Sequence, residues 1–370
     1  MTKILLDLLF FTGARGGMES YVRQLYPEIS KLRPEWELVA LVSDEVDQQL
    51  FSWFPGELIS ISSRNGSAVN WAIGETFQVG QISKKLAVDL IHSPANIGPI
   101  WGKTPVILTI QDLLSFENPK LVGRLTGLFL RQLIRLSARH AKSILTISQS
   151  SKRSIEKHLP KIKGTIRVAE LAGGNRQNLT SQLSVETTDS KVQILSGGNR
   201  LPHKNFKTLL KSLSLIDESQ RPFLTITGGP VDDPLLSIVE DLGLENFVSL
   251  KGWLPQEKIE DLYRDSTLYV FPTLFEGFGL PVLEAMAREC PVVCSDIPVL
   301  REVGGEAAIY VDTTQPAKLA TAIVETLKNK KLLKDLVDKG KDRASEFTWR
   351  KTALTTVDAI EQLLPNLESH

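Results

Sequence analysis

Short apolar runs rich in β-branched residues alternate with helix-length segments along most of the chain. The runs are Lys3–Phe10, Glu37–Ser43, Leu58–Ser62, Asp89–His92, Val106–Ile110, Ser143–Ile147, Ile166–Ala169, Val192–Ser196, Phe223–Thr227, Phe247–Lys251, Leu268–Phe271, Val292–Ser295 and Ala308–Val311. This alternation predicts an α/β fold with parallel sheets flanked by helices. Sheets of this kind bind ligands beyond the carboxyl ends of their strands.

The chain has 370 residues, which suggests about two domains. Arg176–Ser190 is polar and lacks periodicity, so it is the best candidate for a linker. We therefore predict Rossmann-like domains at 1–180 and 191–345. Phe347–Trp349 precede a helical stretch, Lys351–Leu364, and we expect residues 346–370 to return to the first domain.

The composition is that of an ordinary globular protein, with 42% hydrophobic and 23% charged residues. A net charge of zero gives no indication of nucleic-acid binding. Lys3–Phe11 reads as a buried first strand and not as a signal peptide, since no small-residue cleavage site follows. No apolar run approaches the roughly 18 residues that span a bilayer. We expect a cytoplasmic protein in which Cys290 and Cys294 are reduced core residues.

The most informative segment is Phe271–Gly305, in which a strand is followed by a loop containing Gly277 and Gly279. Pro281 suits the first turn of a following helix, and the N–H groups at such a helix start form an anion site. Glu276 and Glu284 flank the loop, and each is suited to accept hydrogen bonds from sugar hydroxyls. An ordinary strand–turn–helix remains the alternative.

This segment resembles the donor site of glycosyltransferase family 4. The likeness lies in EGFGLPVLE, Glu276–Glu284, followed by AMA, PVV, SDIPVLREV and GGEAAIYVD. It implies a GT-B fold, in which two Rossmann-like domains face each other across a cleft. It also implies a nucleotide-sugar donor, retention at the anomeric carbon, and no metal or other cofactor. By this resemblance Glu284 binds the ribose, Glu276 contacts the transferred sugar, and the backbone of Gly277, Phe278, Gly279 and Leu280 holds sugar and diphosphate.

Other loops resemble the same family. Gly13–Leu25 resembles its N-terminal glycine loop, in which Gly16 and Gly17 approach the diphosphate or acceptor. Ser196–Leu213 resembles the loop whose basic residues neutralise the diphosphate; there Lys204 precedes Asn205, a good N-cap. Gly228, Trp253 and Leu254 stand in loops that resemble those around the nucleotide base.

Two positions depart from the family pattern. Asn199 stands where an arginine is common, five residues before Lys204, and we expect Arg200 to take its role. Gln111 stands where relatives carry a catalytic histidine, and glutamine cannot titrate. Either it only positions groups, or catalytic efficiency differs here.

The expected mechanism stabilises the negative charge that grows on the departing diphosphate. Lys204, Arg200 and the Gly277–Leu280 backbone could do so without a metal. Asp232 and Asp233 read as a solvated loop. The resemblance, and not the spacing, implies front-face attack assisted by the leaving phosphate.

A basic stretch without acidic residues runs from Asn118 to Ile155, and Arg131, Arg135 and Arg139 share one helix face within it. Leu125, Leu128, Phe129, Ile134 and Leu136 supply apolar area. A helix packed on the sheet with a solvated charged face is one interpretation. Contact with the anionic inner face of the plasma membrane is the other.

Sugar transfer is the leading function, with a glycan or lipid-linked acceptor and a mannosyl or rhamnosyl donor favoured for cell-surface polysaccharide synthesis. A non-catalytic GT-B scaffold or sensor and an epimerase-type nucleotide-sugar enzyme are the alternatives. Nicotinamide dehydrogenases are disfavoured, because no G-x-G-x-x-G follows the first strand. Of the histidines, His92 could line the cleft, and His203 is expected near phosphates.

Overall fold

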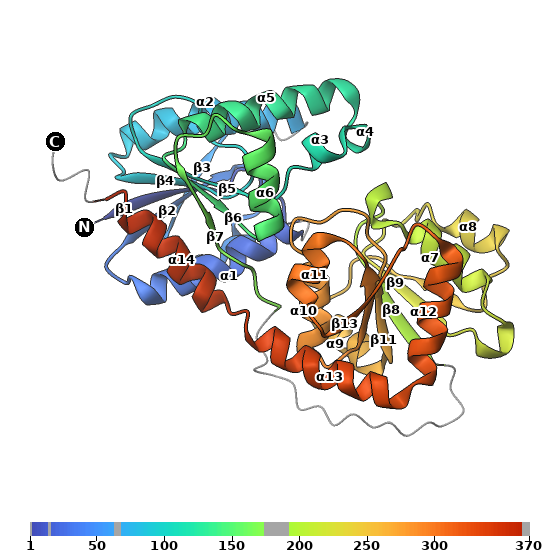
Figure 1. Ribbon diagram of the computed structural model, residues 1–370. Coiled ribbons are helices and arrows are strands. Elements are labelled where there is room, and N and C mark those ends of the chain that lie inside the picture. Colours follow the sequence, from blue (N-terminus) through green and yellow to red (C-terminus); the bar gives the residue numbers. More distant parts are fainter. Residues whose placement is uncertain (1, 14–15, 63–67, 174–191, 365–370) are drawn as a thin grey trace. The chain divides into compact units, whose positions relative to one another are not determined.

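The computed structural model describes residues 2–13, 16–62, 68–173 and 192–364 (Figure 1). The chain divides into two compact units, one made of Met1–Leu171 with Thr348–His370 and the other of Ala172–Phe347. The predicted linker Arg176–Ser190 and the predicted boundaries at 180 and 191 lie outside the described residues.

Unit 1, Met1–Leu171 with Thr348–His370, is built on a parallel sheet. In the described residues its strands are β1 (Lys3–Asp7), β2 (Glu37–Ser43), β3 (Glu57–Ile61), β4 (Leu90–Ser93), β5 (Val106–Ile110), β6 (Ser143–Thr146) and β7 (Thr165–Val168). Their order is β3-β2-β1-β4-β5-β6-β7. Because the strand order reverses beside β1, the β1–β4 junction is a topological switch point.

Helices cover the sheet of unit 1. They are α1 (Gly17–Leu32), α2 (Ala68–Lys85), α3 (Leu114–Glu117), α4 (Pro119–Val122), α5 (Arg124–His140), α6 (Gln149–His158), α14 (Trp349–Glu361) and the 3-10 helix η1 (Gln48–Phe51). Figure 1 shows α14 beside α1 and α5 beside α2. α14 begins two residues before the predicted helix, because the Thr348 hydroxyl accepts the Lys351 N–H and caps the first turn.

Unit 2, Ala172–Phe347, repeats the plan. Its described strands are β8 (Gln193–Gly197), β9 (Phe223–Thr227), β10 (Val248–Leu250), β11 (Leu268–Phe271), β12 (Val292–Ser295) and β13 (Ala308–Val311), in the parallel order β10-β9-β8-β11-β12-β13. Its described helices are η2 (Pro202–Lys204), α7 (Phe206–Ser214), η3 (Glu218–Gln220), α8 (Leu236–Asp241), α9 (Gln256–Asp265), α10 (Leu280–Ala287), α11 (Pro298–Gly304), α12 (Pro316–Lys328) and α13 (Lys330–Ser345).

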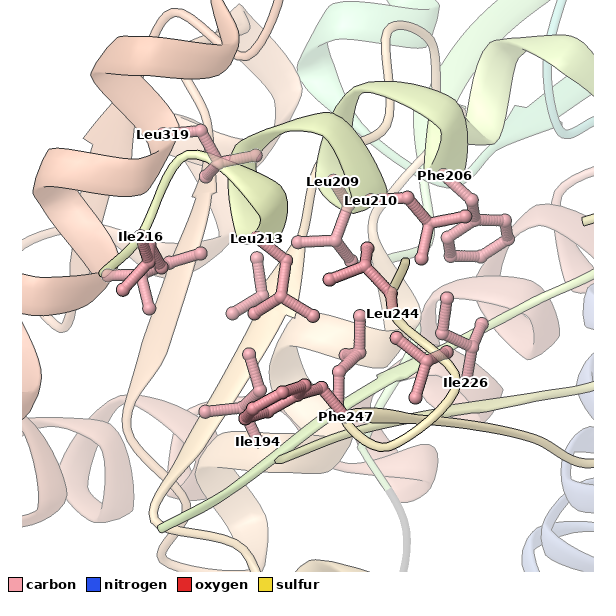
Figure 2. Packing of buried hydrophobic residues seen from close by; sticks show 14 of the residues in the cluster. Ile194, Phe206, Leu209, Leu210, Leu213, Ile216, Ile226, Leu244, Phe247 and Leu319 are labelled. Atoms are coloured by element: carbon pink, nitrogen blue, oxygen red, sulfur yellow. The ribbon is translucent and has the colours of Figure 1, made fainter. Parts of the chain in front are cut away.

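The core of unit 2 lies between α7, α12 and the sheet. Figure 2 shows Leu209, Leu210 and Leu213 of α7 packed with strand and loop residues that include Ile194 and Phe247. Leu209 and Leu213 are four residues apart, so they lie on the same helix face and bury it against the sheet.

The predicted α/β fold is confirmed. Each predicted strand is present, and apart from the first all of them agree with the structure to within one residue at either end. β1 ends early, at Asp7, because the Phe11 N–H turns back to the Leu8 carbonyl at 3.0 Å. Cys290 and Cys294 are buried and free, as predicted. Among the helices of the described residues, none is both long and apolar enough to cross a bilayer.

Candidate donor site

Lys204 and Glu276 meet at the carboxyl edge of the unit 2 sheet. Lys204 follows β8 and Glu276 follows β11, and these two strands are neighbours where the strand order reverses. The Lys204 Nζ lies 2.5 Å from Oε1 of Glu276, with side chains 13% and 14% exposed. Switch points of this kind are the usual ligand sites of open α/β sheets. The structure therefore brings together two predicted site residues that are far apart in sequence.

The loop after β8 is fastened to the loop after β11. The Leu274 N–H donates to the His203 carbonyl at 2.7 Å. The Asn205 amide donates to the carbonyls of Pro272, at 3.1 Å, and Thr313, at 2.9 Å. As predicted, Asn205 is the N-cap residue of α7, but its side chain makes no capping bond to a backbone N–H and is used in these contacts instead. Its own backbone is left-handed, with φ 59°. These bonds fix Lys204 relative to β11.

The glycine loop after Glu276 leads directly into α10. Gly279 has φ +99°, and a Cβ there would lie 2.4 Å from Cδ2 of Leu300, so only glycine fits. No side chain among the described residues caps the start of α10, and Pro281 stands in its first turn. The N–H groups of this loop and the positive end of the helix suit an anion.

Glu284 lies one turn further into α10. Burial raises the pKa of its carboxyl to about 6. Arg288, one turn beyond, is held by Glu260 through bonds of 2.7 and 2.6 Å. Within the described ranges no hydrogen bond or ion pair reaches the Glu284 carboxylate, so it is placed to accept bonds from hydroxyl groups of a ligand.

The loops after β9 and β10 form one backbone-linked edge. The Gly228 N–H donates to the Gly252 carbonyl at 3.1 Å, and the Gly229 N–H donates to the Lys251 carbonyl at 3.2 Å. Gly228 has φ +82°, which favours glycine. Trp253 in this edge is 56% exposed, and Leu254 follows it. An exposed indole is a suitable platform for a planar base.

Arg200 does not present a free cation. It forms an ion pair with Asp233, 2.7 Å between Nη2 and Oδ2, in which the two side chains are only 5% and 6% exposed. The prediction that Asp233 belongs to a solvated loop is wrong, although Asp232 beside it is exposed. No sequence pattern indicates this pair, whose members are 33 positions apart.

The predicted glycine loop of unit 1 is held by Glu19. Its Oε1 accepts the N–H groups of Thr12, at 2.9 Å, and Gly13, at 3.0 Å. Gly16 and Gly17 open α1, and a Cβ at either would meet nothing within 4 Å among the described atoms. Packing within unit 1 therefore gives no reason for glycine at these two positions.

Gln111 and His92 are both buried in unit 1. Gln111 is 5% exposed, and its Nε2 donates to the Pro94 carbonyl at 3.3 Å. His92 lies between the Tyr26 hydroxyl, 3.2 Å from Nδ1, and the Thr109 hydroxyl, 2.8 Å from Nε2. Burial lowers the pKa of His92 to about 3. The suggestion that His92 lines a cleft is wrong, because it is a fully buried core residue.

One buried acid was not predicted from the sequence. Asp7 ends β1 and has no exposed surface. Its Oδ2 accepts the Ser93 hydroxyl at 3.1 Å, while Oδ1 has no partner among the described residues. Burial raises the pKa of its carboxyl to about 7. Its position inside an apolar strand is the sequence feature that could have predicted a buried carboxyl group.

Residues 182–343 match the family model described as Glycosyl transferases group 1. Over this region the chain is similar to the group 1 glycosyltransferases. It is 28% identical over 267 residues to the O-antigen chain mannosyltransferase B of Escherichia coli, covering 70% of each chain. It is also 28% identical to the O-antigen chain mannosyltransferase RfbU of Salmonella typhimurium, covering 65% of each.

Comparison with solved structures shows that the chain has the GT-B fold. The sucrose-phosphate synthase of Thermosynechococcus elongatus aligns with a TM-score of 0.78 at 17% identity, over 99% of this chain and all of that one. HepE of Anabaena in complex with UDP-glucose aligns with a TM-score of 0.70 at 18% identity over the whole of both chains.

Proposed function

We propose that the chain transfers a mannosyl residue from a nucleoside diphosphate sugar to a cell-surface glycan. The observation that carries the proposal is the Lys204–Glu276 contact at the switch point of unit 2, beside the uncapped start of α10. The mannosyl donor is favoured because the two O-antigen relatives are named mannosyltransferases. A scaffold or sensor role is disfavoured by a site in which both glutamates and the lysine are present.

Each residue has a role in this proposal. Lys204 and the N–H groups of the Gly277–Leu280 loop bind the diphosphate and stabilise the charge that develops as it departs. Glu276 accepts hydrogen bonds from the sugar, and Glu284 accepts them from the ribose. Trp253 and Gly228 border the base. Transfer proceeds with retention and without a metal, since these groups supply the positive charge.

Gln111 is assigned a positioning role. Its amide bonds the Pro94 carbonyl and its backbone N–H bonds Asn96 at 2.7 Å, so it holds the segment after β4 against the end of β5. It supplies no titrating group to the reaction.

Binding is tested first, with a thermal-shift panel of GDP, UDP, ADP and dTDP. A nucleotide at a hundred times its dissociation constant adds about 2.7 kcal/mol of stability. Lys204→Gln should make the shift much smaller. Lys207→Gln, which removes an exposed lysine on the adjoining helix α7, is the matched control and should keep it.

Transfer is tested with the matching nucleotide mannose and an O-antigen-type acceptor, and the product is examined by NMR. An α-linked product from an α-linked donor supports retention. Hydrolysis of the donor without transfer to any glycan, or no binding of any nucleotide, would contradict the proposal.

The acceptor side carries a second proposal, that helix α5 contacts an anionic membrane bearing a lipid-linked acceptor. Leu125, Leu128 and Leu136 are 82%, 50% and 42% exposed on this helix, whereas Ile134 is buried in the core of unit 1. The same helix carries Arg131, Arg135 and Arg139, and it lies in a stretch of sequence without acidic residues. Apolar and basic side chains on one exposed face suit an anionic lipid surface.

A further inference from the structure

The guanidinium of Arg200 has no donor left for a ligand. Its Nε bonds both carboxylate oxygens of Asp233, at 3.0 and 2.8 Å, and Nη2 bonds Oδ2. Nη1 donates to the carbonyls of Gly198 and Thr227, each at 2.9 Å. Nη2 also donates to the Ile226 carbonyl, at 3.4 Å. A guanidinium has five N–H donors, and these contacts use all of them.

The face of the guanidinium is covered as well. Its central carbon lies 5.2 Å from the centre of the Phe206 ring. With a carboxylate in its plane and an aromatic ring on one face, the cation is both neutralised and enclosed. A phosphate would have to displace a bidentate carboxylate to reach it.

The Arg200–Asp233 pair joins three segments at the carboxyl edge of the sheet. Gly198 follows β8, Ile226 and Thr227 end β9, and Asp233 Oδ1 also accepts the Leu235 N–H before α8, at 3.0 Å. The fit is close: a Cβ on Gly229 would lie 2.3 Å from Oδ2 of Asp233 and 2.6 Å from Nη2 of Arg200.

Lys204 differs from Arg200 in the same site. Its single ammonium has one carboxylate partner, Glu276, and the pair is more than twice as exposed as the arginine pair. A lysine also holds its partner without the bidentate geometry of arginine. Of the two pairs, only that of Lys204 can exchange its carboxylate for a phosphate without loss of the loop structure.

We propose that Arg200 and Asp233 are a positioning pair that sets the loops after β8 and β9 for the nucleotide, and that Lys204 is the side-chain cation on the diphosphate. This inference rests on the proposed function. It replaces the expectation that Arg200 neutralises the diphosphate directly. Arg200 acts through the carbonyls that it holds, and Asp233 is as necessary as the arginine.

Asp233→Asn separates the two roles, because it frees the Arg200 charge without removing it. If Arg200 bound phosphate directly, this variant would bind the nucleoside diphosphate as well as wild type or more tightly. In a positioning pair it weakens binding by about tenfold or more, since small displacements of binding loops have large effects. Calorimetry with the nucleoside diphosphate found in the wild-type panel measures this.

The remaining variants complete a double-mutant cycle. Arg200→Gln should match Asp233→Asn, and the double variant should be no worse than the poorer single one. The donor KM should rise while kcat stays within a few fold. Binding should keep the salt dependence of wild type in all three, whereas Lys204→Gln should reduce it, because only Lys204 meets the charged phosphates.

Folding is checked in each variant by circular dichroism and thermal unfolding. The double variant leaves no unpaired charge, so it remains folded where a single one does not. Tighter binding by Asp233→Asn, or a reduced salt dependence in Arg200→Gln, overturns the inference. Lower melting temperatures with unchanged affinity also overturn it, because the pair then has only a structural role. Failure of wild type to bind any nucleotide overturns the proposed function instead.

Discussion

Glu276→Gln should strengthen the binding of a nucleoside diphosphate while it weakens sugar transfer. The Glu276 carboxylate holds the Lys204 ammonium at 2.5 Å, so a diphosphate must compete with it for the same cation. It must also approach a negative charge. Glutamine has nearly the same shape and removes both obstacles.

The expected gain in diphosphate affinity depends on how exposed the Lys204–Glu276 ion pair is. Fully exposed ion pairs contribute about 0.2–1 kcal/mol, and breaking buried ones costs about 3–5 kcal/mol. At 13% and 14% exposure the Lys204–Glu276 pair lies between these limits. We take about 1–2 kcal/mol, which corresponds to a roughly 5- to 30-fold lower dissociation constant.

Calorimetry with the nucleoside diphosphate and with the intact nucleotide sugar measures the effect. The gain should be smaller for the nucleotide sugar, because glutamine loses charge-assisted bonds to the sugar hydroxyls. Glu257→Gln, at an exposed position on α9, is the control for the change in net charge. Equal or weaker binding of the diphosphate to Glu276→Gln would refute the exchange at Lys204.

Three further predictions concern the same protein. Burial raises the pKa of Glu284 to about 6, so nucleotide affinity should fall as pH drops through about 6; Glu284→Gln should lose at least about tenfold at neutral pH and show no such dependence. Transfer should persist in EDTA, and loss of activity that magnesium or manganese restores would exclude the metal-independent mechanism. Replacing Arg131, Arg135 and Arg139 with Gln should weaken binding to anionic vesicles by roughly a hundredfold at low salt, at about 1 kcal/mol per charge. The matched triple variant, in which Lys330, Lys331 and Lys334 on α13 become Gln, should bind the vesicles as wild type does. Equal sedimentation of wild type and both triple variants would mean that the basic face of α5 is only solvated.

The fold was predictable because its signal is local and repeated. The central strands of a parallel sheet are buried on both faces, so each reads as a short continuous apolar run such as Val106–Ile110 or Leu268–Phe271. The end of β1 was harder to predict. Leu8 to Phe11 are as apolar and buried as the strand itself, and only a backbone turn separates them from it.

The part of the candidate site that lies in one sequence segment could be predicted. Contacts between residues that are far apart in the sequence could not. Glu276, Gly279 and Glu284 are in a single loop and helix, so their spacing determines their placement. The ion pairing of Arg200 depends on how the loops after β8 and β9 approach each other. A pattern of residue types shows that an arginine is present but not that an aspartate 33 residues later neutralises it.

Asp7 makes the pH dependence of stability a test of the unit 1 core. It is buried at the β1–β4 switch point, and burial raises the pKa of its carboxyl from 3.8 to about 7. Between these values the folded protein keeps the proton and the unfolded chain loses it. The stabilising contribution of the protonated acid is complete below about pH 4 and is lost as pH rises to about 7, at about 1.4 kcal/mol per pH unit.

Asp7→Asn removes this titration while keeping the shape of the side chain and a polar partner for Ser93. The variant should exceed wild type in free energy of unfolding by up to about 4 kcal/mol at pH 8, and the difference should shrink as pH falls towards 4. Chemical denaturation at a series of pH values measures it, with Asp44→Asn, at an exposed position of unit 1, as control. Other acids affect both proteins equally, so only the difference between them is diagnostic. A difference that does not change between pH 4 and 8 would mean that Asp7 is already ionised in the folded core, and a positive group or water must then reach its unpartnered Oδ1.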